Sequence, residues 1–291
     1  MAVRTGRVPI ADVICLLAFA LLVMAPLLMA PGLPDLSAIM EKPGPEHWLG
    51  TDVLGRDLLL RVGLAMSGGV LPVWGAVLAG TLSGVVLAMG LVAAGQLRAL
   101  APLAGLIQAL LVVVAAIPLG IVVFAWAAWQ EKAGIGPVML GLGALFMVRT
   151  CLYVRDLYRQ DRWLEYWQAR AAMGGRLVPT LVEYGIRRSW APHLGETLGF
   201  HLRAAVAIEA SLSYLGFGIQ EPGASFGNML ASHFDSYLKG EWWPLLVICA
   251  GLTISFLTPP ACLRIGAVIM DRLKKPGRMS EQTPRPVQMW T

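Results

Sequence analysis

Polar side chains interrupt one otherwise apolar stretch, residues 194–215, and these are Glu196, His201, Arg203 and Glu209. On a helical wheel Glu196 and Arg203 align two turns apart, whereas Glu209 and Ser213 share a different face. Ionisable groups are costly in hydrocarbon, so in membrane helices they face the protein interior or water and often line a route for substrate. We therefore expect Arg203, Glu209 and Ser213 along a translocation pathway, with Glu209 supporting a gate. A structural role for Glu209, capping or pairing with a neighbouring helix, fits the pattern equally well.

The stretch HWLGTDVLGRD, residues 47–57, offers a second set of candidate ligands. A metal site at His47, Asp52 and Asp57 is the alternative to a structural role. A structural role is the better prediction, because glycines permit tight turns and Thr or Asp side chains cap helix starts. The residues of this structural signature are Gly50, Thr51, Asp52, Gly55, Arg56 and Asp57. The other histidines show no ligand spacing, so we expect no metal site; they are His193, His201 and His233.

The sequence contains no recognisable catalytic or nucleotide-binding motif. There is no HExxH and no GxxxxGK[ST], and no lysine follows a glycine anywhere in the chain. We therefore expect a non-enzymatic protein that needs no cofactor and cannot cradle ATP phosphates by that motif. The four cysteines stand singly in apolar segments, which suits small buried side chains better than a disulfide framework.

Membrane helices must position these residues. The chain is 57% hydrophobic and 14% charged, and its mean hydropathy is +0.66, which is typical of membrane proteins. A bilayer core about 30 Å thick needs roughly 20 apolar helical residues to cross it. Apolar runs predict six spans, within residues 10–30, 70–94, 103–129, 135–153, 194–215 and 243–265. The first run could instead be a cleaved signal peptide, but Pro31 spoils the obvious cleavage site and we expect a retained anchor.

Basic residues indicate the orientation of these spans. Arginines are concentrated between the fourth and fifth predicted spans, and basic residues also lie near both termini. Residues 31–61 are rich in acids instead. The positive-inside rule therefore predicts that both termini and the Glu165 region are cytoplasmic and that residues 31–61 face outside. Trp242 and Trp243, at the start of the last span, are expected to act as interfacial anchors.

The segment EYWQARAAMGG, residues 165–175, predicts a short amphipathic helix on the cytoplasmic side. One stripe of the helix, which we call the bulky stripe, comprises Trp163, Leu164, Trp167 and Ala171. The other side, which we call the small face, comprises Glu165, Ala169 and Ala172. Gly174 and Gly175 suit a left-handed C-terminal cap. Such a helix could lie in the lipid headgroup layer. Alternatively, its bulky stripe could anchor it to the bundle while its small face fits a groove on a soluble partner.

Small residues in the second predicted span indicate close helix packing. Gly80, Gly84 and Ala88 recur every four residues. This spacing lets the backbones of neighbouring membrane helices approach each other. The pattern predicts a helical bundle and does not identify a function.

Three stretches resemble, in order and spacing, motifs of the permease subunits of ATP-binding-cassette (ABC) importers, specifically the dipeptide, oligopeptide and nickel permease family. Residues 165–174 resemble its cytoplasmic EAA loop, and residues 47–57 resemble its HxLGTDxLGRD signature. EASLSYLGFG at residues 209–218 and FGNML at residues 226–230 resemble its EASLSFLGLG and WGNML block. The resemblance covers about residues 10–270.

Some positions depart from the family pattern. Gln168 stands where the loop's eponymous glutamate is usual, and Arg170 stands where an alanine is usual. The Ile-Leu-Pro that normally closes the loop is missing near residues 185–187. TPP at residues 258–260 stands where the family usually has asparagine, leucine and a Gly-Asp pair. The resemblance implies an ATPase contact through Glu165, Gln168, Ala169, Ala172 and Gly174.

The resemblance also implies a fold. We expect an all-α membrane protein with six transmembrane helices, the type I ABC importer permease fold, and both termini in the cytoplasm. Residues 1–61 would form an N-terminal anchor plus an extracytoplasmic segment. Residues 62–270 would form a permease core of five helices that includes a coupling loop, 154–192, and residues 271–291 would form a cytoplasmic tail.

The implied function is half of a translocation pathway for di- or oligopeptides in the inner membrane, driven by a separate ATPase. The same machinery could instead import nickel or metal–opine complexes. Because nickel is transported within this family, the resemblance also allows a metal site at His47, Asp52 and Asp57, but the motif is shared with peptide permeases and a structural role stays the better prediction. The implied partners are a second permease subunit, one or two ABC ATPase subunits, an extracytoplasmic substrate-binding protein and membrane lipid, without nucleic acid. An ion-coupled secondary transporter is the alternative of a different class, but it would spread ionisable residues over several spans and often show an internal repeat.

Overall fold

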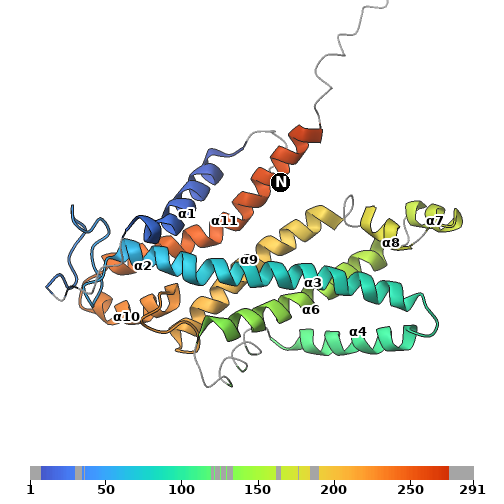
Figure 1. The fold of residues 1–291 in the computed structure, drawn as a ribbon, viewed down its shortest axis with the longest axis horizontal. Helices are drawn as coiled ribbons and strands as arrows, with labels where there is room; N and C mark the ends of the chain where they lie inside the picture. Colours follow the sequence, from blue (N-terminus) through green and yellow to red (C-terminus); the bar gives the residue numbers. More distant parts are fainter. Residues whose placement is uncertain are drawn as a thin grey trace, which may run out of the picture.

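The computed structural model describes residues 8–29, 35, 37–118, 121, 125, 129, 134–161, 165–175, 177–183 and 190–274. Within these ranges the chain is built of helices, and β-type pairing is limited to one isolated bridge between Thr51 and Asp57. Figure 1 shows α3 (Leu71–Gly95), α6 (Ile135–Asp161) and α9 (Ala191–Tyr214) running along the molecule. α1 (Ile10–Leu28) lies beside α11 (Trp243–Lys274). The prediction of an all-helical protein is confirmed for the described residues.

Four helical stretches of the described chain are long and apolar enough to cross a membrane, and they are Ile10–Leu28, Leu58–Gly95, Ile135–Asp161 and Trp243–Met270. They correspond to the first, second, fourth and sixth predicted spans. The third predicted span is represented by α4 (Ala101–Ala116), which has 16 residues. The remainder of that prediction lies largely outside the described residues. The fifth predicted span corresponds to α9, which has 24 residues. Because it contains Glu196, Arg203 and Glu209, its mean hydropathy is lower than that of the four apolar stretches.

The second span begins earlier than its apolar run predicts. α2 (Leu58–Leu64) continues through a π-helical turn, η2 (Ala65–Val70), into α3. Asp57 fixes the start, because its Oδ1 accepts the backbone N–H groups of Leu59 at 2.8 Å and Leu60 at 3.1 Å. The helix-capping role predicted for the acids of residues 47–57 is thus confirmed for Asp57.

Small residues let α3 and α6 pack closely. A Cβ built on Gly80 would collide with the carbonyl oxygen of Gly143, and one on Gly84 with that of Met147. Ala88, one turn further on, is buried in a cluster that also contains Cys151. The prediction that these residues bring two backbones together is therefore confirmed.

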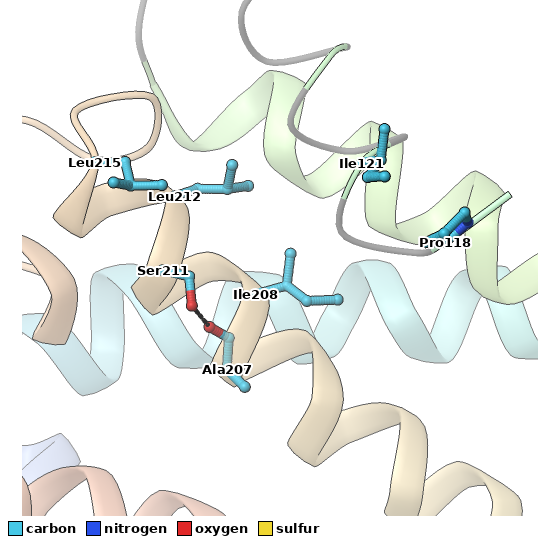
Figure 2. A pocket seen from close by; sticks show the side chains of 7 residues that line it. All are labelled: Pro118, Ile121, Ala207, Ile208, Ser211, Leu212 and Leu215. Atoms are coloured by element: carbon cyan, nitrogen blue, oxygen red, sulfur yellow. Dashed lines mark hydrogen bonds between the residues drawn. The ribbon is translucent and has the colours of Figure 1, made fainter.

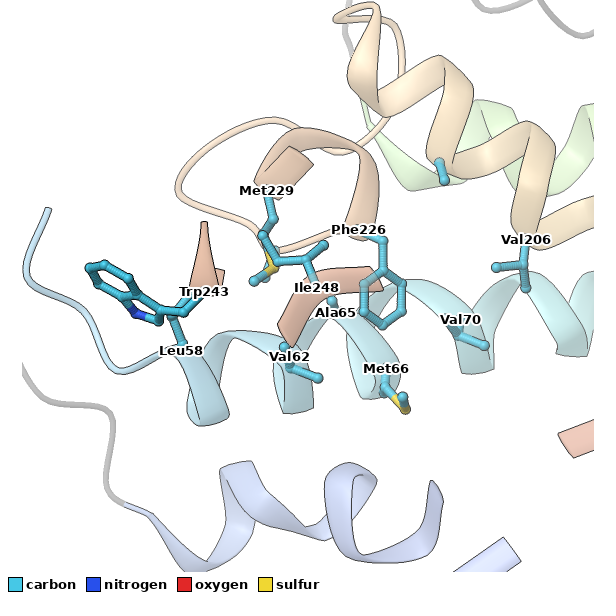
Figure 3. Close-up of a cluster of buried hydrophobic side chains, with 12 residues drawn as sticks. Leu58, Val62, Ala65, Met66, Val70, Val206, Phe226, Met229, Trp243 and Ile248 are labelled. Carbon is cyan, nitrogen blue, oxygen red and sulfur yellow. The ribbon is translucent and has the colours of Figure 1, made fainter. Parts of the chain in front are cut away.

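A buried core joins α2 and η2 to α9, α10 (Phe226–Leu238) and α11. Figure 3 shows Phe226 and Met229 of α10 packed with Ile248 of α11 above the α2–η2 segment. Trp243, predicted to be an interfacial anchor, is instead 7% exposed and lies in this core. The reason is steric, since its ring packs against Gly50, where a side chain could not fit. Trp242 is 58% exposed, as an anchor requires.

An ion pair connects α1 with α11. The guanidinium of Arg264 donates from Nε to Asp12 Oδ2 at 2.7 Å and from Nη2 to Asp12 Oδ1. Asp12 is 4% exposed, so this bidentate contact neutralises an acid that would otherwise be costly in the first apolar helix. The pair joins residues 252 positions apart.

Short helices occupy the two ends of the bundle. α10 lies at one end, and α7 (Glu165–Ala172) and α8 (Leu177–Thr180) lie at the other (Figure 1). The helix predicted at residues 165–175 is therefore present. Its cap is also as predicted, because Gly174 has a φ of 74° and the Gly175 N–H donates to the Arg170 carbonyl at 2.9 Å. Trp163 and Leu164 of its predicted anchor lie outside the described residues.

Gly84→Leu should destabilise the bundle, because the new side chain must push α6 away from α3. We expect a loss of about 2 kcal/mol or more, measured as a lower midpoint of thermal unfolding in detergent. Gly90→Leu is the matched control, since a Cβ on Gly90 meets no atom within 4 Å. Equal midpoints for the two variants would contradict the packing described here.

Candidate functional site

One face of α9 carries a continuous row of exposed or half-buried side chains, which we call the α9 stripe: His193, Glu196, Phe200, Arg203, Ala207, Ser211 and Tyr214. The residues recur every three or four positions, so they form one line along the helix. The stripe begins with polar groups, continues through small side chains and ends with an aromatic ring. Glu196 and Arg203 share it, as their spacing predicted.

Two grooves flank the small part of the α9 stripe. One has a volume of about 470 Å³ and lies between α9 and the segment after α4; Figure 2 shows Ile208 and Leu212 on its α9 wall and Pro118 and Ile121 opposite. The other, of about 440 Å³, lies between α9, α10 and α11. Ala207 and Ser211 line both grooves. The Ser211 hydroxyl donates to the Ala207 carbonyl at 2.8 Å, so its polar hydrogen is satisfied within the helix.

Glu209 and Ser213 lie on the opposite, buried face of α9. Each is 2% exposed. The Ser213 hydroxyl donates to Glu209 Oε1 at 2.7 Å and accepts the backbone N–H of Ile219 at 2.9 Å. The side chain of Ser225, which caps α10, interacts with the same carboxylate. These contacts give Glu209 the helix-pairing role that was one of its two predicted roles; a gate role stays a prediction.

Glycines complete the turn from α9 to α10. Gly216 has a φ of 89°, a conformation that other residues rarely adopt. A Cβ on Gly218 would collide with the Ser213 hydroxyl, and one on Gly227 would collide with the Ala210 carbonyl. The EASLSYLGFG and FGNML stretches are therefore one packed unit, in which small residues and hydroxyls hold α10 against α9.

A cluster of four charged residues, the arginine clasp, joins this turn to α2 and the stretch before it; the cluster comprises Asp52, Arg56, Arg61 and Glu221. Asp52, with a fully buried side chain, accepts the Nε of Arg56 at 2.6 Å. Arg56 Nη1 donates to Glu221 Oε2 at 2.6 Å, and Arg61 Nη2 donates to Glu221 Oε1 at 2.7 Å. Two parts of the chain 165 residues apart are thereby connected.

The electrostatics of the clasp keep Arg56 charged. Burial would lower the pKa of Arg56, but the hydrogen bonds and negative charges of Glu221 and Asp52 outweigh burial and raise that pKa above its ordinary value. Glu221 was not predicted as a site residue. No local pattern marks this residue, because its partners Arg56 and Arg61 lie 165 and 160 residues away in the sequence.

The candidate metal ligands His47, Asp52 and Asp57 all contact other protein groups. His47 Nδ1 lies 3.0 Å from Asp57 Oδ2, while Asp57 Oδ1 caps α2. Asp52 Oδ1 accepts the N–H groups of Leu54 and Arg56 at 2.8 and 2.9 Å. Gly50 and Gly55 have φ values of 78° and 71°, as tight turns require. In the described parts of the chain, no group of three or more His, Cys, Asp or Glu side chains could hold a metal ion.

The small face of α7 is open to the surroundings of the chain. Ala169, Ala172 and Gly174 are exposed, as is Gln168. The side chains of Glu165 and Trp167 lie outside what the structure describes. The rest of the described chain therefore leaves this part of the small face uncovered.

Comparison with known proteins bears on this arrangement of three motifs. The chain is 29% identical over 267 residues to the oligopeptide transport system permease protein OppC of Mycobacterium tuberculosis, which covers 84% of the chain and 87% of that protein. It is 28% identical over 216 residues to the dipeptide transport system permease protein DppC of Bacillus subtilis, covering 70% and 61%, respectively. No protein-family model matches the chain. The chain is thus similar over most of its length to proteins named as peptide transport permeases.

The resemblance to these permeases, inferred from three motifs, is thus confirmed. The structure shows what two of the motifs do. The residues 47–57 motif builds the start of α2 and half of the arginine clasp, and the residues 209–230 block builds the α9–α10 turn and supplies Glu221. The two motifs therefore meet in space.

Ser213→Ala should destabilise the protein, because it removes two hydrogen bonds and leaves Glu209 and the Ile219 N–H poorly satisfied in a buried place. A loss of about 1–3 kcal/mol is expected, measured by thermal unfolding. Ser211→Ala, on the exposed face of the same helix, should change stability by less than about 0.5 kcal/mol. If the two variants were equally stable, the buried network could not have the role assigned to it.

Glu221→Gln should weaken the arginine clasp, because it removes the charge that faces Arg56 and Arg61. Removal of one partner from such a partly buried network costs about 1.5–3 kcal/mol. Glu46→Gln, at an exposed acid of the same region, serves as control. The clasp would be unsupported if limited proteolysis cut residues 216–225 no faster in Glu221→Gln than in the control.

Proposed function

We propose that the chain is the permease subunit of an ABC importer and forms half of a translocation pathway for di- or oligopeptides. The α9 stripe carries this proposal. A helix that crosses a membrane cannot present Glu196 and Arg203 to lipid without a large cost. The stripe must therefore face either water or another protein, and a pathway between two permease subunits offers both.

The proposed pathway also requires a membrane topology for the whole chain. If α4 with the residues after it and α9 both cross the membrane, the chain has six spans and its termini lie on one side. The arginines between α6 and α9 favour the cytoplasm for that side and for α7. The proposed regions are 1–61, 62–270 and 271–291, as the sequence predicts. The inner membrane is the expected location.

The proposed cargo rests on the relatives. OppC and DppC are named for oligopeptide and dipeptide transport, which favours peptides over nickel. Since the sequence has no P-loop, the energy would come from separate ATPase subunits. A second permease subunit and an extracytoplasmic binding protein would complete the importer.

In the proposed mechanism α7 receives the movement of the ATPase. Glu165, Gln168, Ala169, Ala172 and Gly174 would contact a groove on that subunit. ATP-driven closure would displace α7, and the packed bundle would convert the displacement into opening of the pathway toward one side. Arg203 lies on the pathway face in this account. Glu209 and Ser213 would support the outer end of the pathway from behind α9.

The test is purification of the tagged chain from its native membrane. The wild type should bring down a second permease subunit and an ATPase, and uptake by the purified complex should require ATP. Ala169→Glu should reduce the recovered ATPase about tenfold or more, because it buries an unpaired charge in the contact. Gln96→Glu, an exposed position on the loop after α3, should leave recovery unchanged.

Two outcomes would overturn the proposal. One is uptake by the purified chain alone, driven by an ion gradient, which would indicate a secondary transporter. The other is normal recovery of ATPase and normal uptake with Ala169→Glu, which would remove α7 from the contact.

A further inference from the structure

Arg170, in the last turn of α7, reaches across to the segment that follows this helix. Its Nε donates to the hydroxyl of Thr180 at 2.9 Å, and its Nη2 lies 3.6 Å from Glu183 Oε2. Thr180 is 3% exposed. The contact therefore runs from an exposed helix to a buried acceptor.

The chain folds tightly around this side chain. After Gly174 turns with a positive φ, a Cβ on Gly175 would collide with Cγ and the carbonyl oxygen of Arg170. Glycine at that position thus makes room for the arginine. An isolated helix of eight residues is marginal in water, so α7 needs such contacts to hold one position.

The far side of the contact belongs to the core of the bundle. Leu181, next to Thr180, is fully buried in a cluster with Val154 of α6 and Trp190, the residue before α9. The indole Nε1 of Trp190 donates to Asp161 Oδ2 at the end of α6, at 2.8 Å. Arg170 is therefore connected through packed groups to the end of α6 and the start of α9.

We propose that Arg170 is a positioning residue: it braces α7 against Thr180 and Glu183, so that displacement of α7 is transmitted to α9 rather than absorbed by the intervening turn. The inference rests on the proposed function and deepens it. It assigns a role to the side chain that stands where an alanine is usual. A flexible connection would let the ATPase move α7 without moving the pathway.

The brace predicts uncoupling rather than loss of assembly. The experiment uses the complete importer, with its ATPase, second permease and binding protein, in proteoliposomes, and measures peptide uptake and ATP hydrolysis in the same vesicles. Arg170→Ala should lower the uptake per ATP hydrolysed about tenfold, the factor expected for a lost charge-assisted hydrogen bond. The amount of ATPase bound to the permease should stay at the wild-type level.

Variants at Thr180 provide the matched controls. Thr180→Val removes the acceptor but keeps the shape, so it should lower the same ratio in the same direction. Thr180→Ser keeps the hydroxyl and should behave as the wild type. Arg170→Lys keeps the charge but loses the planar guanidinium, and it should recover only part of the ratio.

A second measurement follows the brace directly. Amide hydrogen exchange in residues 165–172 should be about tenfold faster in Arg170→Ala than in Thr180→Ser, because fewer contacts resist local opening. If Arg170 had a purely structural role, Arg170→Ala would instead reduce assembly, ATP hydrolysis and uptake together. The uptake per ATP hydrolysed would then stay unchanged.

The outcomes separate the two proposals. If the wild type binds no ATPase, the proposed function fails, and the coupling role of Arg170 fails with it. If the wild type imports peptide and Arg170→Ala keeps the same uptake per ATP, the inference alone is overturned. Unchanged exchange in residues 165–172 would also overturn it.

Discussion

The charged side chains of a largely apolar chain need partners inside the protein, and this constraint organises the molecule. Asp12 is neutralised by Arg264, which joins the first and last long helices. Asp52 and Glu221 are neutralised by Arg56 and Arg61, which join the start of α2 to the turn after α9. Each pair replaces water with fixed donors, so the same contacts that lower the cost of burial also fix which helices are neighbours.

The constraint has a different result on α9. Its two faces divide the polar residues, with Glu209 and Ser213 bonded inside the chain and Glu196 and Arg203 on the α9 stripe. Apolar packing covers the first face, whereas grooves beside Ala207 and Ser211 border the second. The difference explains why one helix can belong to the core and still leave polar side chains uncovered on its other face.

Local signals in the sequence were enough for several features. The glycine spacing of residues 80–88 predicted close packing, and an acid before an apolar run predicted the cap at Asp57. The shared face of Glu209 and Ser213 predicted their proximity, which proved to be a direct hydrogen bond. Each signal is local, because successive residues of the pattern stand at most four positions apart and helix geometry decides which of them share a face.

Features that depend on distant residues were missed. The partner of Asp12 is 252 residues away, although opposite charges at the expected cytoplasmic ends of the first and last spans were a usable hint. Trp243 is predicted to be an interfacial anchor from its place at the start of a span. The residues around it in the sequence do not indicate that Gly50 leaves space for its ring. The start of the second span was placed too late, because Arg61 interrupts the apolar run and its burial depends on Glu221. The α10 helix was also missed, although Ser225 and Asn228 form a capping box that marks its start.

We propose that the α9 stripe faces a second permease subunit across a pathway. Photo-crosslinking from benzoylphenylalanine in place of Phe200, which is 61% exposed on the stripe, tests it in the native membrane. We expect a covalent product with a second permease chain from this position and none from Leu140, which is 69% exposed on α6. Products with lipid alone from both positions would contradict it.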